Sequence, residues 1–434
     1  MNPTTIAIIG IIVLVLIFLL RMPVAVAMGV VGFVGFAVAS SMDGALRIVA
    51  KDMWATFSSY SLSVAPMFVL MGTIAFYSGI SSRLFDAANK WLGRLPGGLS
   101  LATIAACAGF GAMCGSTTAA AAAMGKVTLP EMKRYGYNDA LRTGCVASAG
   151  SLAIMIPPST VLIIYGVMTE QSIGKLFIAG IIPGILLIAF LSIPAIAMAY
   201  LRPGLAPKGY KVSWRERWRS LRTVWPIVVV MASILGAIYG GIATATETAG
   251  VGVVVALIIA VVFFKMRWKQ LKEALKEAAL INGMILFIIF AANFFTYVLG
   301  STNVASGLEE LVGSSGLNRW VVIVIINVII LILGCILDPI TITLLTIPIF
   351  IPLIVSLGFD PIWFTVMFCI NTQIGLVTPP MGTDLFAVRT IFNIPTGEII
   401  RGVAPFMLCE LVFLAVIVAF PQLSLWLPSL MVGS

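Results

Sequence analysis

Residues 155–160 read Met-Ile-Pro-Pro-Ser-Thr, and residues 377–383 read Val-Thr-Pro-Pro-Met-Gly-Thr. Both stretches lie inside long apolar segments, where a pair of prolines removes two backbone donors and interrupts a helix. Helix packing alone does not account for such a pair deep in a membrane. The two stretches therefore predict two broken helices, and the other features of the sequence are arranged around them.

The composition is that of an integral membrane protein. Of the 434 residues, 60% are hydrophobic and 10% are charged, whereas soluble domains carry about 25% charged residues. The apolar runs are continuous rather than alternating, which favours helices over a barrel. We expect an all-α membrane protein with about ten transmembrane helices and two re-entrant hairpins, at 98–130 and 320–356. The predicted crossings are 5–20, 23–40, 62–79, 140–170, 174–200, 224–241, 248–265, 279–300, 362–392 and 402–427.

The sequence contains no histidine, and its six cysteines fall in apolar segments without a CxxC pairing. Histidine is the commonest general base and a common metal ligand, so its absence disfavours metal-dependent chemistry. An intramembrane enzyme would also need a Ser–Lys or paired-Asp arrangement at one depth, which the predicted spans do not offer. These features favour a transporter over an enzyme, and we expect no organic cofactor.

The net charge of +9 resides in the loops beside the predicted spans. With the N-terminus outside, Lys and Arg concentrate in inner loops at positions 21, 83–94, 133–142, 202–222, 265–276, 389 and 401. The outer loops hold only Arg47, Lys51, Lys175 and Arg319. Positive charge marks the cytoplasmic side, so this asymmetry sets the orientation of a multi-pass membrane protein and favours it over a nucleic-acid-binding protein. The segments 214–222 and 267–276 are expected to lie as basic amphipathic stretches at the inner surface.

A shift of 222 positions superimposes two parts of the chain without gaps. This register pairs prolines and glycines that fix backbone breaks: Pro130 with Pro352, Gly136 with Gly358, Pro157-Pro158 with Pro379-Pro380, Gly180 with Gly402, and Pro183 with Pro405. Because an odd number of crossings separates the hairpins, the second unit is inverted, which is typical of secondary transporters. We expect scaffold helices in 1–97 and a first transport repeat in 98–200. A basic cytoplasmic loop with further scaffold or arm helices follows in 201–300, and a second transport repeat in 301–434.

Each repeat supplies two backbone breaks that carry polar side chains. The hairpin tips read Cys114-Gly115-Ser116-Thr117-Thr118 and Leu337-Asp338-Pro339-Ile340-Thr341. A break frees carbonyl oxygens that coordinate a hard cation, and the next half-helix begins with free amides that favour an anion. Two tips against two broken helices therefore predict two cation sites with an anion between them. The alternative for Ser116, Thr117 and Thr118 is that small residues merely allow helices to pack closely.

Charged residues inside the apolar segments are functional candidates because burying a charge in a membrane is costly. Asp338 is expected to bind a cation or to cap a helix, and Asp384 is expected to face the cavity. Glu247 is explained by an N-cap at a helix start, with substrate contact as the alternative. Lys126 is expected to snorkel or to pair with a carboxylate, and no role is assigned to Glu410.

Four motifs resemble the large membrane subunit (DctM type) of a tripartite ATP-independent periplasmic (TRAP) transporter. They are Gly111-Ala112-Met113-Cys114-Gly115-Ser116-Thr117-Thr118-Ala119, Met155-Ile156-Pro157-Pro158-Ser159, Gly240-Gly241-Ile242 with Thr246-Glu247, and Val377-Thr378-Pro379-Pro380-Met381-Gly382. The resemblance covers nearly the whole chain and implies an elevator-type carrier of the ion-transporter superfamily, with sodium-driven uptake of an organic acid. It also implies two partners: a small four-helix membrane subunit, expected as a separate chain, and a periplasmic substrate-binding protein. The resemblance further implies a multi-pass protein of a bacterial or archaeal cytoplasmic (inner) membrane.

The resemblance also implies site residues. Sodium site 1 would use Gly115, Ser116, Thr117, Ser148, Ala149 and Gly150. Sodium site 2 would use Leu337, Asp338, Thr341, Thr372, Thr378 and Met381. We expect the substrate near Ser159, Thr160, Asn371, Gly382, Thr383 and Asp384. Asp384 stands where the resemblance leads us to expect an uncharged residue such as Asn, which leaves the substrate class and the coupling ion open.

Two other transport hypotheses fit parts of the sequence. A stand-alone ion-coupled organic anion carrier would work without a binding protein, and neighbouring genes for the two partners would argue against it. A channel would need a continuous pore, which two separate hairpins disfavour. The sequence does not name the organic acid, the number of sodium ions or the oligomeric state.

Overall fold

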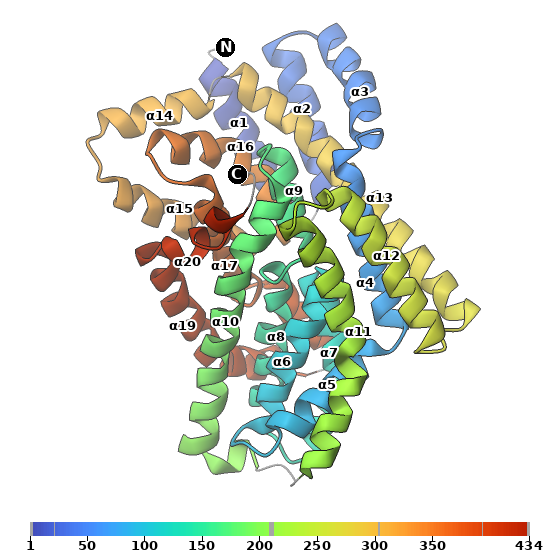
Figure 1. Ribbon diagram of the computed structural model, residues 1–434. Helices are drawn as coiled ribbons and strands as arrows, with labels where there is room; N and C mark the ends of the chain where they lie inside the picture. Colours follow the sequence, from blue (N-terminus) through green and yellow to red (C-terminus); the bar gives the residue numbers. More distant parts are fainter. Residues whose placement is uncertain (1–2, 21, 208–211, 303, 393, 432–434) are drawn as a thin grey trace.

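The computed structural model describes residues 3–20, 22–207, 212–302, 304–392 and 394–431, and these residues form helices and connecting loops without a strand (Figure 1). The first half contains α1 (Pro3–Leu19), α2 (Val24–Ala39), α3 (Met42–Phe57), α4 (Val64–Tyr77), α5 (Ile80–Leu92), α6 (Gly98–Cys114), α7 (Thr117–Arg134), α8 (Asp139–Gly150), α9 (Thr160–Met168) and α10 (Ile173–Leu201). The second contains α11 (Trp214–Tyr239), α12 (Ala245–Val262), α13 (Trp268–Ser301), α14 (Val304–Ser314), α15 (Arg319–Gly334), α16 (Pro339–Ser356), α17 (Pro361–Leu376), α18 (Thr383–Phe392), α19 (Thr396–Ala419) and α20 (Gln422–Leu425).

Helices occupy every predicted crossing and both predicted hairpins. Within the described ranges, 6 helices are individually long and apolar enough to cross a bilayer, namely α10, α11, α12, α13, α16 and α19. The segments 140–170 and 362–392 are each divided into two shorter helices, as their proline pairs predict. The all-helical membrane class is therefore confirmed, and the number of crossings stays a prediction.

Several helix boundaries differ from the predicted ones. Helix α3 was not predicted; it forms a bent pair with residues 61–77, with an angle of 56° at the break. Helices α11 and α13 begin well before the predicted spans at 224 and 279, so their basic stretches are the first turns of long helices. A capping box between Ser213 and Glu216 fixes the start of α11. The last long helix, α19, ends at Ala419 because Pro421 follows closely.

The internal repeat is visible in the helix boundaries. Helices α7 and α16 begin at Thr117 and Pro339, and α8 and α17 begin at Asp139 and Pro361, which is an offset of 222 residues in both cases. Each unit thus contains a helical hairpin, a broken helix and a long closing helix in the same order. The two hairpins lie in different parts of the molecule, α6 and α7 in its lower half and α15 and α16 at its upper left (Figure 1).

The two repeats pack into one body through α8 and α19. A Cβ atom added to Gly144 on α8 would lie 2.6 Å from the backbone nitrogen of Val403 on α19, and closer still to the carbonyl group of Gly402. Only glycine permits this approach of two helix backbones, as at small-residue crossings in other membrane proteins. The broken helix of the first repeat is thereby held against the closing helix of the second.

A second group of helices, α2, α4 and α13, forms a separate support. A Cβ atom added to Gly32 on α2 would lie 2.6 Å from the Cβ atom of Phe294 on α13. The Asn282 side chain of α13 donates to the Pro66 carbonyl oxygen of α4 at 3.3 Å.

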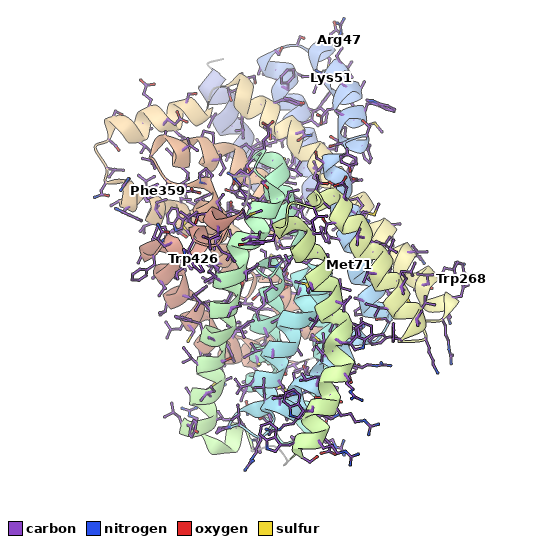
Figure 2. The ribbon with its side chains drawn as sticks, viewed as in Figure 1. Arg47, Lys51, Met71, Trp268, Phe359 and Trp426 are labelled. Carbon is purple, nitrogen blue, oxygen red and sulfur yellow. The ribbon has the colours of Figure 1, made fainter. Side chains whose placement is uncertain are left out.

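Arg47 and Lys51 of the predicted outer side lie at the top of the molecule (Figure 2), whereas α10 ends and α11 begins at the bottom. The basic connection between α10 and α11 therefore lies at the opposite end from Arg47 and Lys51, whereas Trp268, at the start of α13, lies at about mid-height (Figure 2).

Candidate functional site

The tip of the first hairpin is hydrogen-bonded to the break in the first broken helix. Gly115 has a left-handed backbone, with a φ of 59°, and its carbonyl oxygen accepts a bond from the Thr160 amide at 3.3 Å. A Cβ atom at Gly115 would lie 2.8 Å from the Pro158 carbonyl oxygen. Glycine is therefore required here both for the turn and for the contact.

The second repeat makes the corresponding connection. The Gly382 amide donates to the Cys335 carbonyl oxygen at 3.2 Å, and Gly382 is the residue that the 222-residue shift pairs with Thr160. A Cβ atom added to Gly334 at the end of α15 would lie 2.9 Å from the Cα atom of Gly375 on α17. In both repeats the amide of the second residue after the proline pair is thus bonded to a carbonyl group at the end of the first hairpin helix.

A cavity of about 580 Å³ lies where both tips and both breaks approach α4 and α13. Its lining includes six of the predicted site residues: Gly115, Ser116, Thr117, Thr160, Asp338 and Thr383. The structure therefore brings residues of both repeats, which are far apart in the sequence, to one cavity. The remaining wall comes from the scaffold helices.

Four helices, α7, α9, α16 and α18, begin at this cavity. Asp338 caps α16: its carboxylate accepts the amides of Ile340 and Thr341 at 3.1 Å each, and also the Thr341 hydroxyl. Ser159 caps α9 through the Leu162 amide at 3.5 Å. Ser116, at the start of α7, makes no side-chain cap bond. The first-turn amides of α7 therefore have no side-chain cap and are available to an anion.

The two breaks are rich in oxygen atoms that suit a hard cation. The carbonyl oxygens of Leu376 and Thr378 lie 2.7 and 3.0 Å from the position that a Gly382 Cβ atom would take. Each predicted sodium site also contains one fully buried hydroxyl group that has no hydrogen-bond partner in the described structure, Ser148 in site 1 and Thr372 in site 2. Buried hydroxyl groups without partners are rare, and a bound cation would supply one. The residues therefore fit sodium ions.

The other predicted cation ligands lie behind the cavity wall. Ala149 and Gly150 end α8, and a Cβ atom at Gly150 would lie 2.8 Å from the Cα atom of Ala121 on α7. Leu337 is buried at the second tip, whereas Met381 is 39% exposed. The Thr378 hydroxyl donates to the Ile374 carbonyl oxygen at 2.6 Å. These positions adjoin the tips without lining the cavity.

Four predicted substrate residues, Ser159, Asn371, Gly382 and Asp384, are not among the residues that line the cavity. Asp384 is fully buried, because Thr383 occupies the cavity-facing position at the start of α18 and the next residue turns into the body. The expectation that Asp384 faces the cavity is therefore wrong. Asn371 points toward α15, where its amide donates to the carbonyl oxygen of Asn327 at 2.7 Å and to the Asn327 side chain at 3.0 Å.

The capping explanation of Glu247 is confirmed. Glu247 and Thr244 form a reciprocal capping box, in which the Thr244 amide donates to the Glu247 carboxylate at 2.8 Å. Glu410, for which no role was predicted, is fully buried and accepts a bond from Gln373 at 3.0 Å, which links α17 to α19.

One charged residue of the cavity, Glu277 on the scaffold side, was not predicted from the sequence. Glu277 of α13 lines the cavity and accepts a bond from the Tyr77 hydroxyl at 2.7 Å. Lys126 of α7 lines it as well, with its ammonium 5.7 Å from the centre of the Phe76 ring, and forms no ion pair with a described residue. The helical spacing of Ala274, Ala278, Ile281 and Ile285 would have shown that α13 continues through this region.

Two repeats with paired broken helices around one cavity are typical of a secondary transporter. The family model described as the tripartite ATP-independent periplasmic transporter, DctM component, matches residues 11–423. The chain belongs to this family, and it is a multi-pass protein of the inner membrane.

Relatives agree with this family. The chain is 35% identical over 385 residues to the C4-dicarboxylate TRAP transporter large permease protein DctM of Pseudomonas aeruginosa, covering 88% of this chain and 90% of that protein. It is 31% identical to the ectoine TRAP transporter large permease protein TeaC of Halomonas elongata, covering 95% and 96%. In fold it is similar to the YdaH transporter of Alcanivorax borkumensis, with a TM-score of 0.60 at 13% identity over 89% of this chain and 88% of that one.

Replacing Gly115 by Ala tests the contact between tip and break. Gly115 and Gly241 both have left-handed backbones, but an added Cβ atom meets the Pro158 carbonyl at Gly115 and open space at Gly241. We expect Gly241→Ala to cost about 1 kcal/mol and to leave transport intact. Gly115→Ala should abolish most substrate uptake in proteoliposomes. Equal activity of the two variants would contradict a required contact.

Proposed function

We propose that this chain is the large permease subunit of a sodium-coupled symporter that takes up an organic acid delivered by a periplasmic substrate-binding protein. The observation that carries the proposal is the meeting of four helix starts and two oxygen-rich breaks at one cavity. A small four-helix membrane subunit would complete the scaffold. A C4-dicarboxylate is the first substrate to test, because the Pseudomonas relative is named for that class.

The substrate carboxylate would bind at the start of α7. The amides that follow Ser116 have no side-chain cap, and helix N-termini attract anions. Thr160 and Thr383 add hydroxyl groups from the two broken helices. The amides at the start of α16 are already bonded to Asp338, so the carboxylate would occupy the α7 side of the cavity.

Sodium coupling follows from the carboxylate of Asp338. An anionic substrate in the same cavity is repelled by this group, and the repulsion is strong where water is scarce. A sodium ion bound at residues 337–341 and the second break would neutralise Asp338 and allow the substrate to bind. A second ion at residues 115–117 and the end of α8 would hold the first tip in the same way.

An elevator movement suits the way in which the two groups of helices meet. The scaffold is held by its own bonds, including Tyr77 to Glu277 and Asn282 to Pro66. Among the described residues, no hydrogen bond or ion pair joins α4 or α13 to either hairpin tip or either break. The repeats could therefore slide against the scaffold without breaking polar contacts.

The cavity also reaches Tyr77, Lys126 and Glu277, which lie toward the cytoplasm in the predicted orientation. This conformation would therefore release substrate inward.

The variant Asp338→Ala tests the sodium site against a matched control. Asp338 and Asp360 each cap a helix whose first residue is proline, α16 and α17, but only Asp338 lines the cavity. Both Ala variants lose about 1 kcal/mol of capping. Only Asp338→Ala should raise the sodium concentration for half-maximal uptake, by roughly tenfold or more. An unchanged sodium dependence would rule out this role for Asp338.

The variant Lys126→Gln tests whether the cavity attracts an anion. Lys126 lines the cavity, whereas Lys133 lies in the last turn of the same helix, away from it. We expect Lys126→Gln to raise the KM for a dicarboxylate about two- to fivefold, as expected for loss of a partly solvated charge. Lys133→Gln should leave the KM unchanged in the same uptake assay. A KM that is insensitive to Lys126 would mean that the substrate does not pass this residue.

A further inference from the structure

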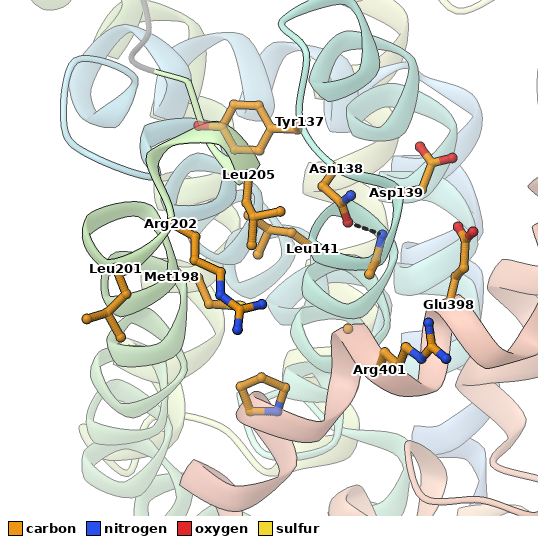
Figure 3. A pocket seen from close by; sticks show the side chains of 13 residues that line it. Tyr137, Asn138, Asp139, Leu141, Met198, Leu201, Arg202, Leu205, Glu398 and Arg401 are labelled. Carbon is orange, nitrogen blue, oxygen red and sulfur yellow. Dashed lines mark hydrogen bonds between the residues drawn. The ribbon is translucent and has the colours of Figure 1, made fainter.

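A second and larger cavity, of about 810 Å³, lies at the end of the molecule that carries the basic connection between α10 and α11. It is enclosed by the loop between α7 and α8, the end of α10 and the start of α19. Figure 3 shows Arg202 and Arg401 on different walls of this pocket, with Glu398 beside Arg401. None of the residues that line it also lines the cavity between the hairpin tips.

The two arginines of this pocket have no hydrogen-bond or ion-pair partner among the residues that the structure describes. Neither Arg202 nor Arg401 takes part in either ion pair within the described ranges, and neither donates a side-chain hydrogen bond there. The nearby Asp139 is engaged with Arg142 at 2.7 Å. Planar guanidinium groups of this kind bind phosphate through paired hydrogen bonds.

The charges of the pocket suit a ligand with one negative charge. Its lining holds two arginines and two carboxylates, Asp139 and Glu398. Because Arg142 compensates Asp139, the remaining groups carry a net charge of about +1. A phosphodiester carries a single negative charge, whereas a free phosphate near neutral pH carries more.

The remaining wall of the pocket is apolar and leads to the surface that faces lipid. Met198, Leu201, Leu205 and Pro405 line the pocket. Leu201 is 81% exposed, and Ile193 and Tyr200 extend the same exposed apolar side along α10. This surface matches the acyl chains of a lipid whose headgroup lies between the arginines. Basic pockets between membrane helices on the cytoplasmic side bind anionic headgroups elsewhere.

We propose that this pocket binds the phosphodiester headgroup of an anionic phospholipid, with Arg202 and Arg401 as its ligands and the exposed side of α10 as the surface for its acyl chains. The site anchors the joint between α8, α10 and α19, where the two repeats meet. It is separate from the proposed substrate cavity, so its test does not depend on transport.

Native mass spectrometry of the delipidated transporter, titrated with phosphatidylglycerol or phosphatidylcholine of identical acyl chains, tests the site. Wild-type protein should prefer phosphatidylglycerol, and the variant Arg202→Gln/Arg401→Gln should weaken its binding roughly tenfold or more. The control Arg219→Gln/Arg222→Gln removes two arginines from α11 that do not line the pocket, and it should keep the preference. The variant Arg202→Lys/Arg401→Lys keeps the charge and should retain part of the binding.

Three results would overturn the assignment. The first is an unchanged lipid preference in the Gln double variant, and the second is an equal loss in the α11 control. The third comes from adding inorganic phosphate or glycerol 3-phosphate as a soluble competitor. If either displaces phosphatidylglycerol at concentrations comparable to that of the lipid, the pocket is a site for free anions and not for a membrane lipid.

Discussion

The structure depends on what happens to backbone groups that are freed inside a membrane. The proline pairs interrupt two helices where no lipid can accept or donate a hydrogen bond, so the exposed amides and carbonyls must find partners within the protein. The hairpin tips supply them: the Thr160 amide bonds to Gly115, and the Gly382 amide bonds to Cys335. Because each tip satisfies a break, the hairpins and the broken helices form one unit.

The same constraint accounts for the chemistry of the cavity. Because four helices begin near one place, their unpaired first-turn amides, which favour an anion, lie beside the carbonyl oxygens of the two breaks, which favour a cation. Asp338 already uses two of the amides at the start of α16. A transporter that carries an anion together with a small cation would make use of both kinds of group at once. Among the described residues, the Ser148 and Thr372 hydroxyls have no hydrogen-bond partner.

The sequence predicted the features that depend on special backbone residues. Proline and glycine positions revealed the repeat offset of 222 residues, and the starts of α7, α8, α16 and α17 reproduce it. The sequence was a much weaker guide to which side of a helix faces the cavity, because membrane helices are apolar on all sides. For that reason Asp384 was expected in the cavity but is buried, Asn371 was expected at the substrate but bonds to Asn327, and Glu277 was overlooked.

Uptake of a labelled C4-dicarboxylate into proteoliposomes tests the central claim most directly. The vesicles would contain this chain with its small membrane partner, and the cognate binding protein would be added outside, with or without an inward sodium gradient. The account predicts accumulation only when both the binding protein and the sodium gradient are present, and the same holds for any other organic acid that proves to be the substrate. Accumulation without the binding protein, or accumulation driven by a proton gradient alone, would contradict it.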